Sequence, residues 1–316
     1  MNASGVLRQG LLQMSKSGRV RDLVERAPMS RDLVKRFVAG DSTPDAVGAA
    51  RALNLTGRRC TIDHLGEDTL DLHQAQMTRD AYLTLIAALG EAGLTQGGKA
   101  EVSLKLSALG QSLPGDGPKI ALEHAREIAQ VAANAGTTVT LDMEDHKTTD
   151  DTLEALRDLR QDFPSVGAVL QAYLLRTEAD CRDLAYEGSR VRLCKGAYDE
   201  PESVAFKDRT EVDRSYVRCL KVLLGGKAYP MIATHDPRLV EIAGALAHKQ
   251  DRAADTFEYQ MLYGIRPEEQ KRIADRGDQM RVYIPYGQEW YGYLIRRMAE
   301  RPANAMFFLR SLATKG

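Results

Sequence analysis

Two adjacent arginines near the end of the chain are well suited to bind an anion. The segment YLIRRMAE places Tyr293, Arg296, Arg297 and Glu300 at positions i, i+3, i+4 and i+7, which share one face of a helix. A guanidinium is a permanent cation whose planar donors match the two oxygens of a carboxylate. A solvated surface helix is the alternative interpretation, because charged side chains usually lie at the surface.

A lysine stands inside a run that is otherwise apolar. Lys105 lies in VSLKLS, a pattern typical of a buried strand. A buried ammonium either finds an anionic partner or loses its charge. The partner is an anionic ligand or an internal ion pair with a neighbouring strand, and the sequence leaves both open.

Carboxylates and further cations end other apolar runs. In LDMED, the alternation of a strand predicts that Asp142 and Glu144 point the same way. In RLCKGAY, Arg192 and Lys195 face opposite sides unless the strand ends between them, and Gly196 permits such an ending.

These residues form one expected cluster of mixed charge. Its predicted members are Lys105, Arg192, Lys195, Asp142, Glu144, Asp145 and Glu258. Cations beside carboxylates suit a small zwitterion better than a neutral sugar. On this chemistry alone we expect an enzyme for a small anionic or zwitterionic substrate, with the reaction open.

The elements that must position these residues alternate along the chain. Apolar runs predict eight strands, at 60–66, 102–110, 137–145, 167–175, 189–198, 229–236, 256–264 and 280–287. Helical periodicity between them is clearest at 77–93, 119–136 and 237–250. Eight such units without a GxGxxG turn favour a (β/α)8 TIM barrel over an open sheet, with strand ends forming the site. We expect residues 1–55 to be an N-terminal helical extension and residues 56–316 the barrel.

Composition excludes several classes of protein. The 316 residues are 43% hydrophobic and 28% charged, with 43 basic and 44 acidic side chains and a formal net charge of -1. This balance disfavours nucleic acid and anionic lipid as general partners. Four cysteines without CxxC spacing indicate no zinc site, so no metal is expected. No run approaches the about 20 apolar residues of a membrane span, so a cytoplasmic location is expected.

Seven segments in order resemble the proline dehydrogenase family over about residues 58 to 310. They are VSLKLSALG, LDMED, VLQAYLLR, RVRLCKGAY, IATHD, FEYQMLYG and RVYIPYGQEWYGYLIRRMAERPAN. The resemblance implies a distorted (β/α)8 barrel that binds FAD and oxidises L-proline to 1-pyrroline-5-carboxylate. Hydride passes from proline C5 to flavin N5, and a quinone reoxidises the flavin. The chain length implies a monofunctional bacterial type.

The resemblance also assigns the residues around the substrate. Arg296 and Arg297, with Lys105, match the residues that hold the proline carboxylate. Tyr283 and Tyr293 match aromatic residues packed around the proline ring. Glu300 matches the acid that supports the arginine pair.

The cofactor positions follow in the same way. Those that match FAD contacts are Met143, Gln171, Lys195, Gly196, Ala197, Thr234 and His235. Arg192 matches the residue beside the reactive edge of the flavin, and Asp142 matches an acid counted as catalytic, which we interpret as holding nearby cations. Asp199 and Asp236 depart from the commonest family residues, which leaves the FAD contacts beside them open.

Partners and rival functions complete the expectations. The resemblance implies L-proline and a quinone as small-molecule partners, 1-pyrroline-5-carboxylate dehydrogenase as a functional partner, and at most peripheral membrane contact. One rival is a metal-dependent lyase or aldolase that uses LDMED for the ion and Lys105 as a Schiff base. The other is a non-catalytic amino-acid-binding protein.

Overall fold

A single sheet of eight parallel strands forms the centre of the molecule. The computed structural model describes residues 34–300, with the side chains of residues 34–297. The strands are β1 (Arg59–His64), β2 (Ala100–Leu104), β3 (Val139–Leu141), β4 (Ala168–Gln171), β5 (Arg190–Cys194), β6 (Tyr229–Ala233), β7 (Glu258–Leu262) and β8 (Met280–Tyr286). All eight predicted strands are therefore confirmed, although each is shorter than its apolar run.

The sheet curls into a nearly closed barrel. Its strand order is β3-β2-β1-β8-β7-β6-β5-β4, and every neighbouring pair is parallel. The first and last strands in this order meet at a bridge between Thr140 and Gly167. Strands buried on both faces read as continuous apolar runs, which is why the sequence located them.

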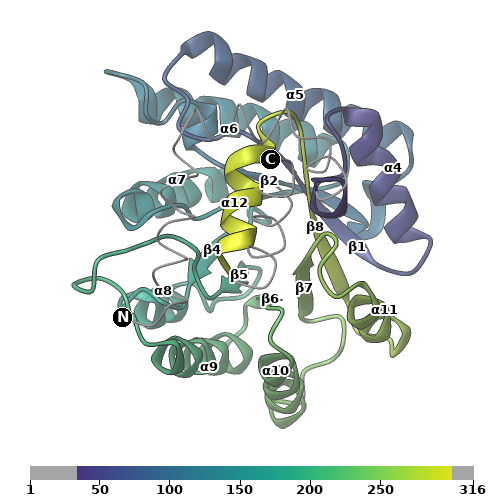
Figure 1. The fold of residues 1–316 in the computed structure, drawn as a ribbon, viewed down its shortest axis with the longest axis vertical. Helices are drawn as coiled ribbons and strands as arrows, with labels where there is room; N and C mark the ends of the chain where they lie inside the picture. The colour runs from purple at the N-terminus through teal and green to yellow at the C-terminus, as the bar shows by residue number, and fades with distance from the viewer. Residues whose placement is uncertain (1–33, 301–316) are drawn as a thin grey trace, which may run out of the picture.

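Helices surround the barrel and alternate with its strands (Figure 1). The α-helices of residues 34–300, of which all but α12 lie outside the barrel, are α4 (Thr43–Asn54), α5 (Leu72–Glu91), α6 (Gly117–Asn134), α7 (Thr149–Asp162), α8 (Thr177–Asp183), α9 (Arg209–Gly225), α10 (Pro237–Lys249), α11 (Pro267–Asp275) and α12 (Trp290–Glu300). The predicted start of α10 is confirmed, because Asp236 accepts the N–H of Arg238 at 3.1 Å and Pro237 follows it.

The described part of the predicted N-terminal extension packs on the barrel. Helix α4 contacts β1, β8 and α5. The carbonyl of Arg36 lies so close to Gly264 that a Cβ there would meet it at 1.7 Å, so only glycine fits in that loop after β7. The domain boundary at residue 55 stays a prediction.

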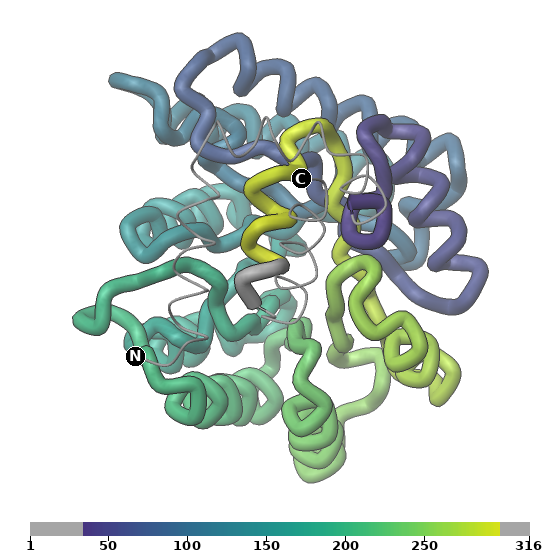
Figure 2. Tube along the Cα trace, in the orientation of Figure 1, coloured from purple at the N-terminus to yellow at the C-terminus, as the bar shows by residue number. Residues whose placement is uncertain are grey.

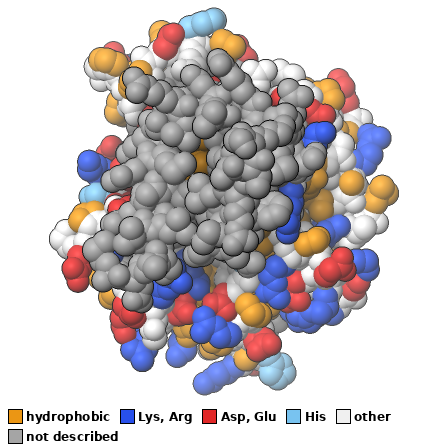
Figure 3. Space-filling model, in the orientation of Figure 1, with side chains coloured by type: hydrophobic (Ala, Val, Ile, Leu, Met, Phe, Trp, Pro, Cys, Tyr) orange, Lys and Arg blue, Asp and Glu red, His pale blue; other side chains and the backbone are white. Residues whose placement is uncertain are grey.

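Helix α12 departs from the ring of outer helices. It lies across the middle of the ring in the view of Figure 1, and the tube in Figure 2 follows the chain from β8 into it. Basic and acidic side chains are interspersed on the visible surface over α9, α10 and α11 (Figure 3). Among residues 34–300, no helix is both long and apolar enough to cross a bilayer.

Candidate active site

Asp142 is the centre of a hydrogen-bonded cluster at the strand ends. It directly follows β3, which ends at Leu141. Its Oδ1 accepts hydrogen bonds from Arg192 Nη1 at 2.7 Å and from Ser103 Oγ at 2.8 Å. Its Oδ2 accepts from Tyr283 Oη at 2.7 Å. Side chains from β2, β5 and β8 therefore converge on one carboxylate.

Lys105 adds a buried ammonium to this cluster. Its Nζ lies 2.6 Å from Oδ2 of Asp63 on β1 and 3.8 Å from Oδ2 of Asp142. Burial alone would lower the pKa of Lys105, but the two carboxylates raise it above its usual value. Lys105 is therefore charged, and it has the internal ion pair with a neighbouring strand that the sequence left open.

Hydrogen bonds from Nε and Nη1 hold the guanidinium of Arg192 in place. Its Nε donates to Gln260 Oε1 at 2.6 Å, while its Nη1 donates to both Asp142 and Ser103. Its Cζ lies 5.4 Å from the ring centroid of Tyr283. Arg192 is only 4% exposed, so its plane is held between strands.

Arg296 attaches α12 to the loop after β1. Both of its terminal nitrogens pair with the carboxylate of Glu67, with Nη1 donating to Oε2 at 2.8 Å. Glu67 also raises the pKa of Lys105, so it acts on the same cluster. The Arg296 side chain is 15% exposed, which rules out a solvated surface helix for this residue.

The other members of the C-terminal motif are partly described. Arg297 has its Cζ 5.3 Å from the ring centroid of Tyr293, a cation–π arrangement, and Tyr293 is buried. The side chain of Glu300 lies outside the described residues, so its supporting role stays a prediction.

Glu144 is a second buried carboxyl near the cluster. It accepts hydrogen bonds from the backbone N–H of Ser107 at 3.1 Å and from Ser107 Oγ at 2.5 Å. Burial raises its pKa to about 7. Glu144 and Asp142 have different partners, because β3 ends at Leu141 and strand alternation no longer applies beyond it.

Lys195 lies just beyond β5, which ends at Cys194, so the strand does end between Arg192 and Lys195, the possibility that the sequence left open. Its Nζ is 2.5 Å from Asp213 Oδ1 and 3.2 Å from Asp236 Oδ2. These acids therefore offset its charge. The following Gly196 has a φ of +107°, and a Cβ there would meet the ring of Tyr173 at 2.3 Å, so glycine is required.

The remaining expected cofactor residues lie at or just beyond the ends of β3, β4, β5 and β6. Gln171 donates from Nε2 to the carbonyl of Glu144 at 2.7 Å. Thr234 Oγ1 accepts the N–H of Asp236 at 3.1 Å. His235 accepts the N–H of Leu262 on Nε2 at 3.0 Å, so this nitrogen carries no proton. Met143 and Thr234 are buried, and Ala197 is half-buried.

One charged residue expected at the strand ends lies elsewhere. Glu258 is the first residue of β7, at the opposite end of the barrel, and is fully buried. Its carboxylate pairs with Arg281, Nε to Oε1 at 2.7 Å. Placing Glu258 in the expected cluster of mixed charge was wrong, because the prediction did not separate the start of a strand from its end.

The sequence of this chain is similar to those of known proteins over most of its length. A family model described as proline dehydrogenase matches residues 46–310. Proline dehydrogenase 1 of Bacillus subtilis is 40% identical over 281 residues, which cover 89% of this chain and 91% of that protein. The chain belongs to the proline dehydrogenase family.

Other members of the proline dehydrogenase family give the same result. Proline dehydrogenase of Deinococcus radiodurans is 38% identical over 307 residues, covering 96% of this chain and 97% of its own. The crystal structure of proline utilization A from Bdellovibrio bacteriovorus matches with a TM-score of 0.79 and 26% identity, over 94% of this chain and 36% of that one. The predicted family and barrel are both confirmed, and the protein is an enzyme of the proline dehydrogenase family.

Sequence reasoning missed three residues of this proline dehydrogenase site. Asp63 pairs with Lys105, and Glu67 pairs with Arg296. Burial and the charge of Glu67 raise the pKa of Tyr198, while the charge of Arg296 lowers it, so Tyr198 belongs with the pair of Glu67 and Arg296. Asp63 carried the same signal as Lys105, a charge inside an apolar run, whereas Glu67 and Tyr198 carried none.

Proposed function

We propose that this chain oxidises L-proline to 1-pyrroline-5-carboxylate, with FAD as the bound hydride acceptor and a quinone as the final electron acceptor. The observation that supports this most is the convergence of Lys105, Asp142, Arg192 and Tyr283 at the strand ends, beneath an arginine-bearing α12, in a proline dehydrogenase chain. Such a mouth suits a small zwitterion, whose two charges meet groups of opposite sign.

The residues present fit an isoalloxazine. That ring system offers carbonyl oxygens and ring nitrogens to hydrogen-bond donors, and it offers flat apolar faces. Arg192 brings its guanidinium to Asp142, just beyond β3, and Gln171 at the end of β4 has a second N–H on Nε2 besides the one donated to Glu144. Met143 adds buried apolar surface. FAD bound there would supply the acceptor for the hydride that leaves proline C5. Lys195, Gly196, Ala197, Thr234 and His235 would hold the rest of the cofactor.

The chain itself would bind and orient the substrate. We propose that Lys105, Arg296 and Arg297 hold the proline carboxylate, since a charged donor is worth more than a neutral one. Holding one end of the ring fixes where C5 lies, and orientation of this kind lowers barriers by several kcal/mol, about 7 at the low end of strong cases. Tyr283 and Tyr293 would pack around the ring and exclude water.

Asp142 would keep the cations in place instead of taking a proton. Each of its oxygens already accepts a hydrogen bond, from Arg192 on one side and Tyr283 on the other. We propose that this arrangement holds Arg192 as a permanent charge beside the reacting atoms, where it stabilises developing negative charge.

The rival aldolase chemistry fits less well. A Schiff-base lysine must be neutral to attack a carbonyl, whereas Asp63 and Asp142 raise the pKa of Lys105. The three carboxylates of LDMED also have separate partners: Asp142 binds Arg192, Glu144 binds Ser107, and Asp145 accepts the N–H of Lys147. No shared ion is needed to explain them.

An absorbance scan of the purified protein tests the proposal. Flavin absorbance that bleaches when L-proline is added and returns when a soluble quinone is added is the expected result. The product is then trapped with o-aminobenzaldehyde to detect the cyclic imine. A protein that retains no flavin after incubation with FAD, or whose flavin stays oxidised with proline, contradicts it. The predicted cytoplasmic location, with at most peripheral membrane contact and a partner 1-pyrroline-5-carboxylate dehydrogenase, rests on the same proposal.

A further inference from the structure

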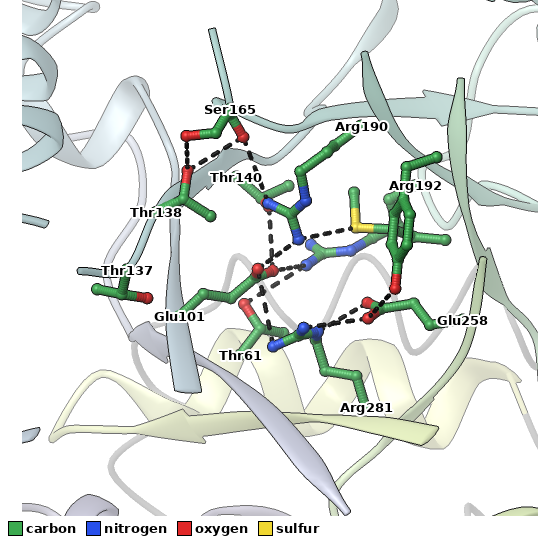
Figure 4. Close-up of polar contacts among 12 residues, drawn as sticks. Thr61, Glu101, Thr137, Thr138, Thr140, Ser165, Arg190, Arg192, Glu258 and Arg281 are labelled. Carbon is green, nitrogen blue, oxygen red and sulfur yellow. Dashed lines mark hydrogen bonds and ion pairs between the residues drawn. The ribbon is translucent and has the colours of Figure 1, made fainter. Parts of the chain in front are cut away.

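A buried arginine network fills the barrel below the candidate active site. We use this name for Glu101, Arg190, Glu258 and Arg281. Figure 4 shows the carboxylate of Glu101 among the guanidinium groups of Arg190, Arg281 and Arg192. Its Oε2 is 2.5 Å from Arg190 and 3.7 Å from Arg281, and its Oε1 is 3.8 Å from Arg192. Arg192 therefore stands where the network meets the site.

The pair of Glu258 and Arg281 is the fixed part of this network. Arg281 donates to both carboxylate oxygens, Nε to Oε1 at 2.7 Å and Nη2 to Oε2 at 3.0 Å. The two side chains are 0% and 2% exposed. Burial by itself raises the pKa of Glu258, but Arg281 outweighs burial and leaves it at about 2. Glu258 is therefore an ionised carboxylate that can only accept hydrogen bonds.

Gln260 connects this pair to Arg192. Its Nε2 donates to Glu258 Oε1 at 2.6 Å, and its Oε1 accepts from Arg192 Nε at 2.6 Å. The amide has one stable orientation, because the carboxylate requires a donor and the guanidinium requires an acceptor. Gln260 is 3% exposed, so water is not available to replace either bond.

We propose that Gln260 is a positioning residue for Arg192, an inference that rests on the proposed function. Gln260 is held by the Glu258–Arg281 pair and in turn holds the Arg192 guanidinium in one position. Because Gln260 is neutral, it adds no charge beside Arg192. The carboxylates that touch Arg192 closely are then confined to the side of Asp142, at 2.7 Å. The positive charge of Arg192 stays available to the reacting atoms.

The hydrogen bond to Nε sets the plane of the guanidinium. Without it, Arg192 keeps the bonds of Nη1 to Asp142 and Ser103, and the opposite edge of the guanidinium is left with only the longer contacts of Nη2, to Thr61 at 3.5 Å and Glu101 at 3.8 Å. A charge that stabilises a transition state must be held in place before the reaction, and a displacement of about 1 Å can lower a rate about 100-fold. Substrate binding depends on other cations and is expected to change little.

Two substitutions of Gln260 test this proposal. Gln260→Met keeps the length and removes both hydrogen bonds, whereas Gln260→Asn keeps the amide but is too short to reach both partners. We expect kcat with proline to fall about 10- to 100-fold in Gln260→Met, with KM changed less than threefold. A second measurement is the dissociation constant for sulfite, which adds to oxidised flavin and is favoured by nearby positive charge. We expect that constant to rise at least fivefold in Gln260→Met. In both measurements, Gln260→Asn should lie between wild type and Gln260→Met.

Tyr229→Phe is the matched control. Tyr229 Oη donates to Glu258 Oε2 at 3.1 Å, so its loss weakens the same network without touching Gln260 or Arg192. We expect kcat and sulfite affinity within twofold of wild type in this variant. The proposal is wrong if Gln260→Met retains wild-type kcat and sulfite affinity, if KM alone changes, if Tyr229→Phe lowers kcat equally, or if both Gln260 variants fail to fold. A wild-type protein that binds no flavin refutes the proposed function instead, before any variant is compared.

Discussion

The ammonium of Lys105 lies 2.6 Å from Oδ2 of Asp63, a carboxylate on the neighbouring strand. Asp63 is 1% exposed, and burial raises its pKa although Lys105 opposes that effect. Taking two ions out of water is costly, and the pair offsets this only while both partners remain. The pair therefore makes the candidate site dependent on Asp63, a residue that sequence reasoning missed.

Asp63→Asn tests that dependence. We expect this variant to lose about 3 kcal/mol of unfolding free energy, because it leaves the Lys105 ammonium buried beside a neutral amide. Urea denaturation followed by circular dichroism measures the loss. Asp80→Asn is the control, since Asp80 is exposed and pairs with Arg79 at 2.8 Å; it should lose less than about 1 kcal/mol. Equal losses in the two variants would show that the buried pair contributes no more to the free energy of unfolding than the exposed pair does.

Tyr283→Phe tests the second donor to Asp142. Removing Oη takes away a hydrogen bond of 2.7 Å to a carboxylate, which is worth about 1.5–3 kcal/mol. We expect kcat/KM for proline to fall about tenfold, because Asp142 then holds Arg192 less firmly. Tyr216→Phe removes a buried hydroxyl that donates to the carbonyl of Leu193 at 3.1 Å. That control should lower stability and leave kcat/KM unchanged.

Arg297→Lys tests the proposed carboxylate contact. A lysine keeps the charge but not the planar pair of donors, so we expect KM for proline to rise at least about tenfold with kcat within threefold. Steady-state kinetics with a dye acceptor measures both constants. Arg272→Lys on α11, which alters an exposed pair with Glu269, should change neither. A variant with altered melting temperature but wild-type KM would assign Arg297 a purely structural role.

The fold was predictable because its signals are local. Strands of a parallel barrel are buried on both faces, so each is an apolar run in the sequence. The residues at which the strands end were less predictable. The run 102–110 contains β2 only to Leu104, and the chain then turns through a short 3-10 helix at Ser107–Leu109. The apolar residues of that turn are as buried as those of the strand, so hydrophobicity alone does not separate them.

A site residue was predictable from the sequence where its own type and position are unusual. It was less predictable where its role depends on a partner from another element. Lys105 stood out as a charge in an apolar run, but its partner depends on β1 lying beside β2, a pairing that spacing does not show. Glu67 lies in an ordinary polar loop, and only the placement of α12 over the mouth brings Arg296 to it. The assignments of Arg296 and Arg297 to substrate came from the resemblance and stay predictions.

Glu144 gives the protein an expected dependence of stability on pH. Its pKa is about 7 in the folded protein, against an ordinary value of 4.5, because burial disfavours the charged form. The folded state therefore binds this proton more tightly than the unfolded state, and folding is favoured below pH 4.5. Stability is lost as pH rises from about 4.5 to about 7. The full effect is about 3 kcal/mol.

Glu144→Gln should remove that dependence, because an amide at this position has no proton to lose. We expect the unfolding free energy of the variant, relative to wild type, to improve by about 3 kcal/mol between pH 4.5 and pH 8, measured by urea denaturation at each pH. Taking the difference between variant and wild type cancels the titration of other groups. Glu123→Gln, an exposed change on α6, should give a difference that is flat across the same range. A flat difference for Glu144→Gln as well would mean that Glu144 titrates normally and that Ser107 stabilises its ionised form enough to offset burial.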